Sequence, residues 1–179
     1  FGRYFLNDNF LKFWFRFVYP NLSSIEAGVF DVGRIRSEYP AHLGSVFERV
    51  CREYLVRSGF FKFTKFGKWW RKDTEIDLVA VNEPSLEFLF AECKWQERVN
   101  AEKMARELLE KSEGFVWSKE PRRKEELAVF AKSFSKKIGE IGGRRVIRVV
   151  VPHRRGFRPR FLHARRAATG VVAGSRRPL

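Results

Sequence analysis

Residues 69–95, WWRKDTEIDLVAVNEPSLEFLFAECKW, decide the predicted fold of this 179-residue chain. They contain two runs of strand-forming residues, 76–81 and 86–93. Between these runs lies Asn82-Glu83-Pro84-Ser85, in which the proline and the serine suit a tight turn. The pattern predicts a β-hairpin in which Pro84-Ser85 forms a two-residue loop and Glu83 pairs with Leu86.

The same register places Asp77 opposite Glu92 and Glu75 opposite Lys94, so that all four side chains project from one face. Glu75 and Lys94 can form a cross-strand ion pair, but Asp77 and Glu92 carry like charges, whose repulsion destabilises a sheet. A divalent cation offsets such repulsion, because Mg²⁺ binds one or two carboxylates while water and phosphate fill its other positions. From these residues alone, an ordinary polar face and a metal site are equally compatible with the sequence.

Length and a hydrophobic content of 44% predict one globular domain with an appended piece. The sequence contains no apolar run that would span a bilayer and no signal peptide, so we expect a cytoplasmic protein without membrane contact. Two cysteines without a CxxC motif, together with three histidines, argue against zinc and against a disulfide framework. The chain starts at Phe1 and has no methionine before Met104, which indicates a fragment or a processed chain.

The net charge of +15 is concentrated near the end of the chain. Residues 1–140 carry 25 Lys and Arg against 21 Asp and Glu, whereas residues 141–179 carry 11 Arg and no acid. Residues 152–179 therefore form a predicted basic tail with three open interpretations. It is a disordered segment that binds polyanions, a solvated tail without a role, or a segment translated out of frame.

Residues 1–40 are predicted to form an aromatic helical linker. A helix over residues 10–19 is expected after Asn7-Asp8-Asn9 and before Pro20, and residues 28–40 are expected to form a connection. The aromatic rings either pack into the interior or form a docking face for a missing upstream domain.

Residues 41–151 are predicted to form one α/β domain. Glu48, on its first helix, is either a surface residue paired with Arg52 or an acid at the edge of the buried stripe. Before the hairpin we expect a helix at 41–58 ended by Gly59 and a strand at 60–66 broken by Gly67. After the hairpin we expect a helix at 101–111 capped by Asn100, which makes a right-handed crossover to a strand at 127–131. A helix at 133–141 and a strand at 146–151 complete the predicted domain.

The order of these elements resembles that of a known superfamily. A helix with Glu48, a strand with Glu75-Ile76-Asp77 and a strand with Glu92-Cys93-Lys94 resemble the PD-(D/E)XK nucleases. Over residues 4–134, the phrases FLNDNFLKFWFRFVYPN, HLGSVFERV, GKWWRKDTEIDLVA and FAECKW resemble the domain of unknown function C-terminal to the P-loop domain of archaeal-type ATPases. The resemblance implies an α/β fold with a restriction-endonuclease-like central mixed sheet, flanked by helices and preceded by the aromatic helical segment. It also implies that residues 1–40 are the end of a missing upstream ATPase or winged-helix region.

The resemblance also implies a site and a reaction. Asp77 and Glu92 would hold Mg²⁺ or Mn²⁺, and Glu48 would join the metal site through water or through a second ion. Lys94 would orient or help deprotonate the attacking water and stabilise charge on the phosphate, so that all four act in hydrolysis of DNA. Such a metal lowers the pKa of bound water and stabilises developing oxyanions. Two other functions stay open: a non-catalytic nucleic-acid-binding or partner-docking module of an archaeal-type ATPase, and a truncated gene remnant. The chain contains no G-x-x-x-x-G-K-[ST] motif, so nucleotide hydrolysis is not assigned to it.

Overall fold

A computed structural model of the chain describes residues 6–117, 123–136 and 138–151. The chain divides into two compact units, and the division falls after Val46, inside a helix. Each unit is described by itself. The predicted basic tail, residues 152–179, lies outside the described residues. None of the described helices combines the length and the apolar character needed to cross a membrane.

The N-terminal unit begins with consecutive helical turns, which confirms the predicted aromatic helical segment. Asp8 caps the first turn by accepting a 2.8 Å hydrogen bond from the N–H of Leu11. Helical turns continue past Pro20, which lies at the start of a 3₁₀ turn, where its missing N–H is least disruptive. The elements are α1 (Asn9–Phe13), the π-helical turn η1 (Trp14–Val18), the 3₁₀ turn η2 (Tyr19–Asn21) and α2 (Leu22–Glu26).

Helix α3 (Gly33–Ser58) starts earlier than the predicted helix at 41–58. The prediction of a connection at 28–40 is therefore wrong over most of its length. Asp31 accepts a 2.8 Å hydrogen bond from the N–H of Gly33 and so satisfies a donor at the helix start. Pro40 lies inside the helix and removes one backbone donor without ending it. Gly59, with a φ of 63°, follows the last turn as predicted.

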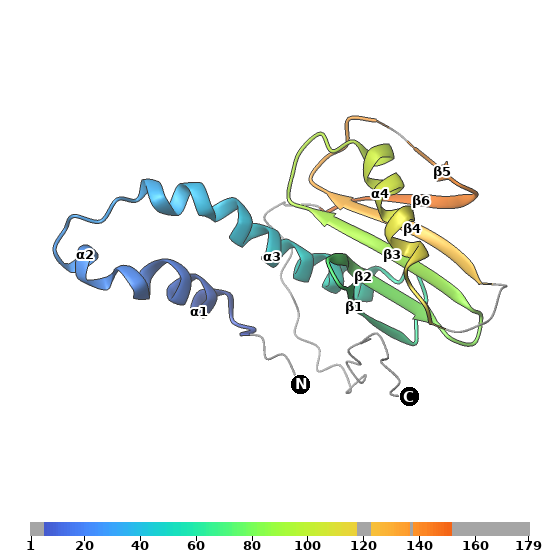
Figure 1. Ribbon diagram of the computed structural model, residues 1–179, viewed down its shortest axis with the longest axis horizontal. Helices are drawn as coiled ribbons and strands as arrows, with labels where there is room; N and C mark the ends of the chain where they lie inside the picture. Colours follow the sequence, from blue (N-terminus) through green and yellow to red (C-terminus); the bar gives the residue numbers. More distant parts are fainter. Residues whose placement is uncertain (1–5, 118–122, 137, 152–179) are drawn as a thin grey trace. The chain divides into compact units, whose positions relative to one another are not determined.

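Six strands form one mixed sheet in the order β1-β2-β3-β4-β6-β5 (Figure 1). β1, β2 and β3 are antiparallel neighbours, whereas β4 is parallel to both β3 and β6. Helix α4 (Ala101–Glu113) makes the crossover from β3 to β4, and Asn100 caps it by accepting from the N–H of Lys103. The predicted α/β fold with a central mixed sheet flanked by helices is confirmed. The strands are β1 (Lys65–Arg71), β2 (Thr74–Asn82), β3 (Glu87–Lys94), β4 (Lys124–Ala131), β5 (Glu140–Ile141) and β6 (Arg144–Val150).

The β2–β3 hairpin has the predicted register. Val79 pairs with Phe90, and Asn82 pairs with Glu87. The connection contains the four residues 83–86 rather than two, and Leu86 adopts a left-handed conformation with a φ of 52°. Because the loop keeps an even number of residues, the pairing and the face of each paired side chain are unchanged.

Two predicted elements are wrong. The first strand is not at 60–66 but at Lys65–Arg71, because an irregularity in the β1–β2 ladder accommodates Gly67 inside the strand. The described residues in the range 133–141 form no helix. They contain the short strand β5, and Phe134 instead bridges to Val99 beside the sheet.

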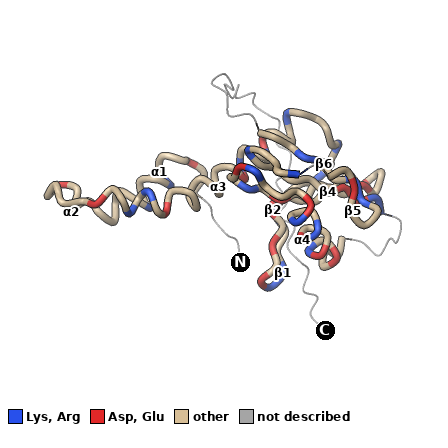
Figure 2. Tube along the Cα trace, turned by 90° about the horizontal axis from the view of Figure 1, so that it is seen from above, with Lys and Arg blue, Asp and Glu red and all other residues tan. Residues whose placement is uncertain are grey.

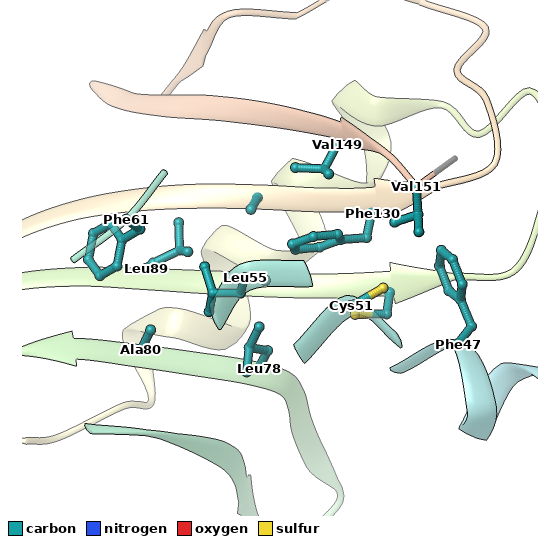
Figure 3. Packing of buried hydrophobic residues seen from close by; sticks show 13 residues of the cluster. Phe47, Cys51, Leu55, Phe61, Leu78, Ala80, Leu89, Phe130, Val149 and Val151 are labelled. Carbon is teal, nitrogen blue, oxygen red and sulfur yellow. The ribbon is translucent and has the colours of Figure 1, made fainter. Parts of the chain in front are cut away.

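Apolar layers cover both faces of the sheet, because β2 and β3 each contain an unbroken run of buried residues whose side chains point to alternate faces. On one face, Phe47, Cys51 and Leu55 from α3 pack against the strands (Figure 3). On the other face, Ala105 and Leu108 from α4 pack beside an aromatic group formed by Trp69, Phe88, Phe90 and Phe115. These layers fix α3 and α4 to opposite sides of the hairpin that carries the predicted site.

Candidate functional site

Asp77 lies at a bulge in β2. Between the Gly67–Val79 and Trp69–Ile76 pairs, β1 contributes only Lys68, whereas β2 contributes both Asp77 and Leu78. Two residues opposite one define a β-bulge, which bends the strand and redirects its side chains. Ile76 and Val79 consequently pack in the same apolar cluster although their spacing is odd. Asp77 itself is buried, with only 8% of its surface exposed.

The carboxylate of Asp77 is held by the neighbouring strand. Its Oδ2 accepts a 2.8 Å hydrogen bond from the backbone N–H of Cys93. The β2–β3 ladder ends one step earlier, at the pair Leu78–Ala91. The side chain of Asp77 therefore continues the pairing in place of a backbone carbonyl, and it lies next to the peptide group that joins Glu92 to Cys93.

Glu92 is buried and contacts two lysines. The Nζ of Lys94 lies 3.4 Å from Oε1, and the Nζ of Lys111, on α4, lies 3.1 Å from Oε2. Burial raises the pKa of Glu92 above its ordinary value, and the charge of Asp77 raises it further, while the two lysines oppose this effect. Glu92 is thus an acid whose ionised form needs positive charge nearby.

Glu48 reaches the same region from α3. Its Oε2 lies 3.2 Å from the Nζ of Lys68, which donates a hydrogen bond to it. Burial raises the pKa of Glu48, the charge of Asp77 adds to the increase, and Lys68 and Arg52 counteract it. The ion pair of Glu48 is therefore with β1, and the predicted surface pair with Arg52 does not occur among the described residues.

Lys68 joins two acids. Its Nζ also lies 2.5 Å from Glu75 Oε1, so Glu75 pairs with β1 and not with Lys94 as the simple polar-face interpretation expected. Burial acts to lower the pKa of Lys68, but the hydrogen bonds and charges of Glu75 and Glu48 outweigh it, and the pKa is raised. Lys68 is accordingly a charged bridge between α3 and the start of β2.

The structure thus gathers all four predicted site residues around the open end of the β2–β3 ladder. Asp77 acts electrostatically on both Glu48 and Glu92, and Lys94 contacts Glu92. Sequence reasoning missed Lys68 and Lys111. Extending the first strand through Gly67 would have placed Lys68 beside Asp77. Nothing in the sequence pairs Lys111 with Glu92, because that contact depends on how α4 packs on the sheet.

The donor chemistry of this site fits a hard divalent cation. Within residues 6–117, 123–136 and 138–151, no group of three or more His, Cys, Asp and Glu side chains is spaced to hold a metal. Mg²⁺, however, commonly uses only one or two carboxylates and fills its other positions with water and phosphate. Asp77 and Glu92 supply that number of carboxylates, and the hydrogen bond from Cys93 engages only one oxygen of Asp77. Among the predicted site residues, Asp77 and Glu92 are therefore the pair whose carboxylates suit a divalent cation.

Comparisons with known proteins place the site inside a family region. A family model described as archaeal and bacterial proteins of unknown function matches residues 14–108, which include all four predicted site residues. An uncharacterised protein of Methanocaldococcus jannaschii is 43% identical over 118 residues, which cover 62% of this chain and 27% of the relative. The matched segment thus spans about a quarter of that relative. No solved structure matches the chain significantly.

Proposed function

The chain belongs to the DUF234 family, archaeal and bacterial proteins of unknown function, and from its site we propose that it is a metal-dependent nuclease-like domain that hydrolyses DNA phosphodiester bonds. The observation that carries this proposal is the convergence of Glu48, Asp77, Glu92 and Lys94 from three elements at the end of one ladder. Two acids whose pKa is raised by burial and by a third acid are typical of a functional site.

Each residue has a defined part in this proposal. Asp77 and Glu92 would hold Mg²⁺ or Mn²⁺, and the Cys93 N–H would keep the Asp77 carboxylate oriented. Such a metal, when bound, lowers the pKa of coordinated water and stabilises negative charge on the phosphate. Lys94 is 40% exposed, so its ammonium group would reach a phosphate at the surface and stabilise the charge that develops there. Glu48 would act through an intervening water.

The case for DNA depends on these residues rather than on a broad basic surface. Acidic and basic residues are interspersed along the described trace (Figure 2). A phosphodiester is an anion, so binding beside three carboxylates requires compensating positive charge. Lys68, Lys94 and Lys111 provide part of it, and a divalent cation would provide the rest.

A second function is favoured by a specific observation. Lys68 and Lys111 already pair with Glu48 and Glu92, so both acids have counter-charges without a metal. That arrangement suits a non-catalytic module that binds nucleic acid or docks on an ATPase. In the archaeal relative the matched segment is accompanied by further polypeptide, which leaves room for such a partner domain.

The deciding experiment is cleavage of single-stranded, double-stranded and branched DNA with Mg²⁺ or Mn²⁺. The wild type would be compared with Lys94→Ala, with Asp77→Asn and with Lys103→Ala, a control on the exposed side of α4. We expect cleavage by the wild type and the control, and a loss of about 100-fold or more in the other two. Equal residual cleavage by the wild type and Lys94→Ala would exclude this site and favour the binding module.

A further inference from the structure

Lys111 contacts Glu92 but has no part in the proposed hydrolysis. It lies in the last turn of α4, and its Nζ donates a 3.1 Å hydrogen bond to Glu92 Oε2. The Glu92 side chain is only 6% exposed, whereas the Lys111 side chain is 29% exposed. The acid is therefore fixed inside the site, and the lysine reaches it from the rim.

A metal and these lysines need the same oxygens. Lys94 lies 3.4 Å from Oε1 and Lys111 lies 3.1 Å from Oε2, so both oxygens of Glu92 have an ammonium neighbour. A divalent cation bound to Glu92 takes at least one oxygen and repels a nearby ammonium group. One lysine must then move away.

Lys111 is the lysine whose departure opens the site. Lys94 stands on the same strand as Glu92, two residues along, and its more exposed ammonium already lies farther from the carboxylate. Lys111 belongs to a different element and reaches Glu92 through a flexible four-carbon stem. Because its side chain is partly exposed, rotation about that stem can carry the ammonium into solvent while α4 stays packed.

We propose that Lys111 is an internal counter-cation of Glu92, which a divalent metal displaces when it binds the Asp77–Glu92 pair. This inference rests on the proposed metal-dependent function and adds a residue that sets the metal affinity. Without metal, Lys111 balances the buried carboxylate and stabilises the fold. With metal, the same side chain is a competitor that has to leave.

Two possible roles of Lys111 predict opposite changes in metal affinity when its charge is removed. If Lys111 competes with the metal, removing its charge strengthens metal binding and destabilises only the metal-free protein. If Lys111 instead holds Glu92 in a metal-binding position, removing it weakens binding. The Lys111→Met variant separates these roles, and Lys111→Arg keeps the charge. Lys103→Met is the matched control, because Lys103 lies on the same helix with a side chain that is 73% exposed.

The first measurement is calorimetric titration of the four proteins with MnCl₂ and with MgCl₂, in the absence of DNA. For Lys111→Met we expect a Kd lower by about tenfold, the change that corresponds to one hydrogen bond to a charged group. Lys111→Arg and Lys103→Met should bind like the wild type. Thermal unfolding without metal should show a lower Tm for Lys111→Met than for Lys103→Met.

A second measurement uses the wild type, so it does not depend on a variant that folds. Lysines are labelled with an amine-reactive reagent, and the rate at each position is followed by mass spectrometry with and without MgCl₂. Released from Glu92, Lys111 should react faster when metal is present, while Lys103 should be unchanged. In Asp77→Asn, metal should have no effect on Lys111.

The results separate displacement of Lys111 from the proposed metal-dependent function. Tighter binding by Lys111→Met together with faster labelling of Lys111 supports displacement. Metal binding by the wild type, with equal or weaker binding by Lys111→Met or an unchanged labelling rate, overturns the role of Lys111 and leaves the proposed nuclease-like function standing. Absence of metal binding by the wild type overturns both.

Discussion

The Asp77 carboxylate accepts a 2.8 Å hydrogen bond from the backbone N–H of Cys93, one step beyond the last pair of the β2–β3 ladder. This bond uses Oδ2 alone, so the structural role of the side chain needs an acceptor oxygen but not a negative charge. The chemistry proposed for the site needs the charge. The two roles can therefore be separated by substitution.

Asp77→Asn should retain the fold and lose the proposed metal binding. An asparagine oxygen can still accept from Cys93, whereas Asp77→Leu leaves a buried N–H without its acceptor and should cost about 1–3 kcal/mol. Urea unfolding would measure the stabilities, and titration with MnCl₂ would measure metal binding, which both variants should lose. Equal destabilisation by the two variants would show that the charge, and not the hydrogen bond, supports the fold.

Lys68→Met should destabilise the protein more than Lys65→Met does. Lys68 is half-buried and bridges Glu48 and Glu75, so its removal leaves two acids without their counter-charge. Lys65, on the same strand, forms an ion pair with the exposed Glu83, and pairs of that kind contribute little. Its ammonium also lies 5.3 Å from the centroid of the Trp117 ring, a contact that is weak at an exposed site. We expect a loss of about 1–2 kcal/mol for Lys68→Met and a clearly smaller loss for Lys65→Met. Chemical denaturation of both variants tests the difference.

Leu55→Ala should cost about 2–5 kcal/mol, because Leu55 is fully buried between α3 and the sheet and its truncation leaves a cavity. Val56→Ala is the control. Val56 is the next residue of the same helix and is 51% exposed, so its truncation should change stability by under about 0.5 kcal/mol. Similar effects of the two substitutions, measured by denaturation, would mean that the C-terminal part of α3 does not pack on the sheet.

Glu92→Gln should stabilise the metal-free protein at neutral pH. Burial and the Asp77 charge raise the pKa of Glu92 above its ordinary value of 4.5, so between the two values the folded state binds more protons than the unfolded state. Stability is then lost as pH rises through this window, and the loss persists above it. The variant avoids the loss, so its advantage over the wild type should grow as pH rises from about 4.5 through the raised pKa. Unfolding measured at a series of pH values from acid to neutral checks this, and a constant difference would contradict it.

His42 gives the N-terminal unit the opposite pH dependence. Burial lowers the pKa of His42 below its ordinary value of 6.5, and the charges of Arg16 and Lys12 lower it further. As pH falls from that value towards the lowered pKa, the unfolded chain binds a proton first, so stability is lost. His42→Phe should remove this sensitivity, since His42 packs among aromatic rings. Proteolysis or hydrogen exchange of residues 6–46 at about pH 7.5 and about pH 5.5 would measure it.

The hairpin could be predicted from sequence because the residues that determine it lie close together in the chain. The apolar runs and the turn residues 82–85 set an even loop, and an even loop sets the faces of the paired residues. The sequence pattern misplaces the first strand because a glycine such as Gly67 is typical of a break in a strand. In the structure it lies beside a bulge, where an irregular ladder tolerates a residue without a side chain.

The partners of the acids were not predictable in the same way. Glu48 could pair with Arg52 one turn later or with a residue on a strand, and only the packing of α3 on the sheet selects Lys68. The contact between Glu92 and Lys111 likewise depends on the position of α4. The four acidic and basic residues proposed from sequence, Glu48, Asp77, Glu92 and Lys94, lie near one another in the structure, whereas tertiary structure determines which charges neutralise them.

The crossover through α4 also imposes an order of assembly. Asp77, Glu92 and Lys94 lie on one hairpin, and hairpins of this kind form in about 1–10 μs because little loop-closure entropy is lost. The parallel pairing of β3 with β4 must wait until the whole α4 segment has folded back, and such non-local pairing is slow. We therefore expect Asp77 and Glu92 to meet before β4 joins the sheet. Until α4 packs on the hairpin and brings Lys111 to Glu92, Lys94, solvent and dissolved cations screen their repulsion.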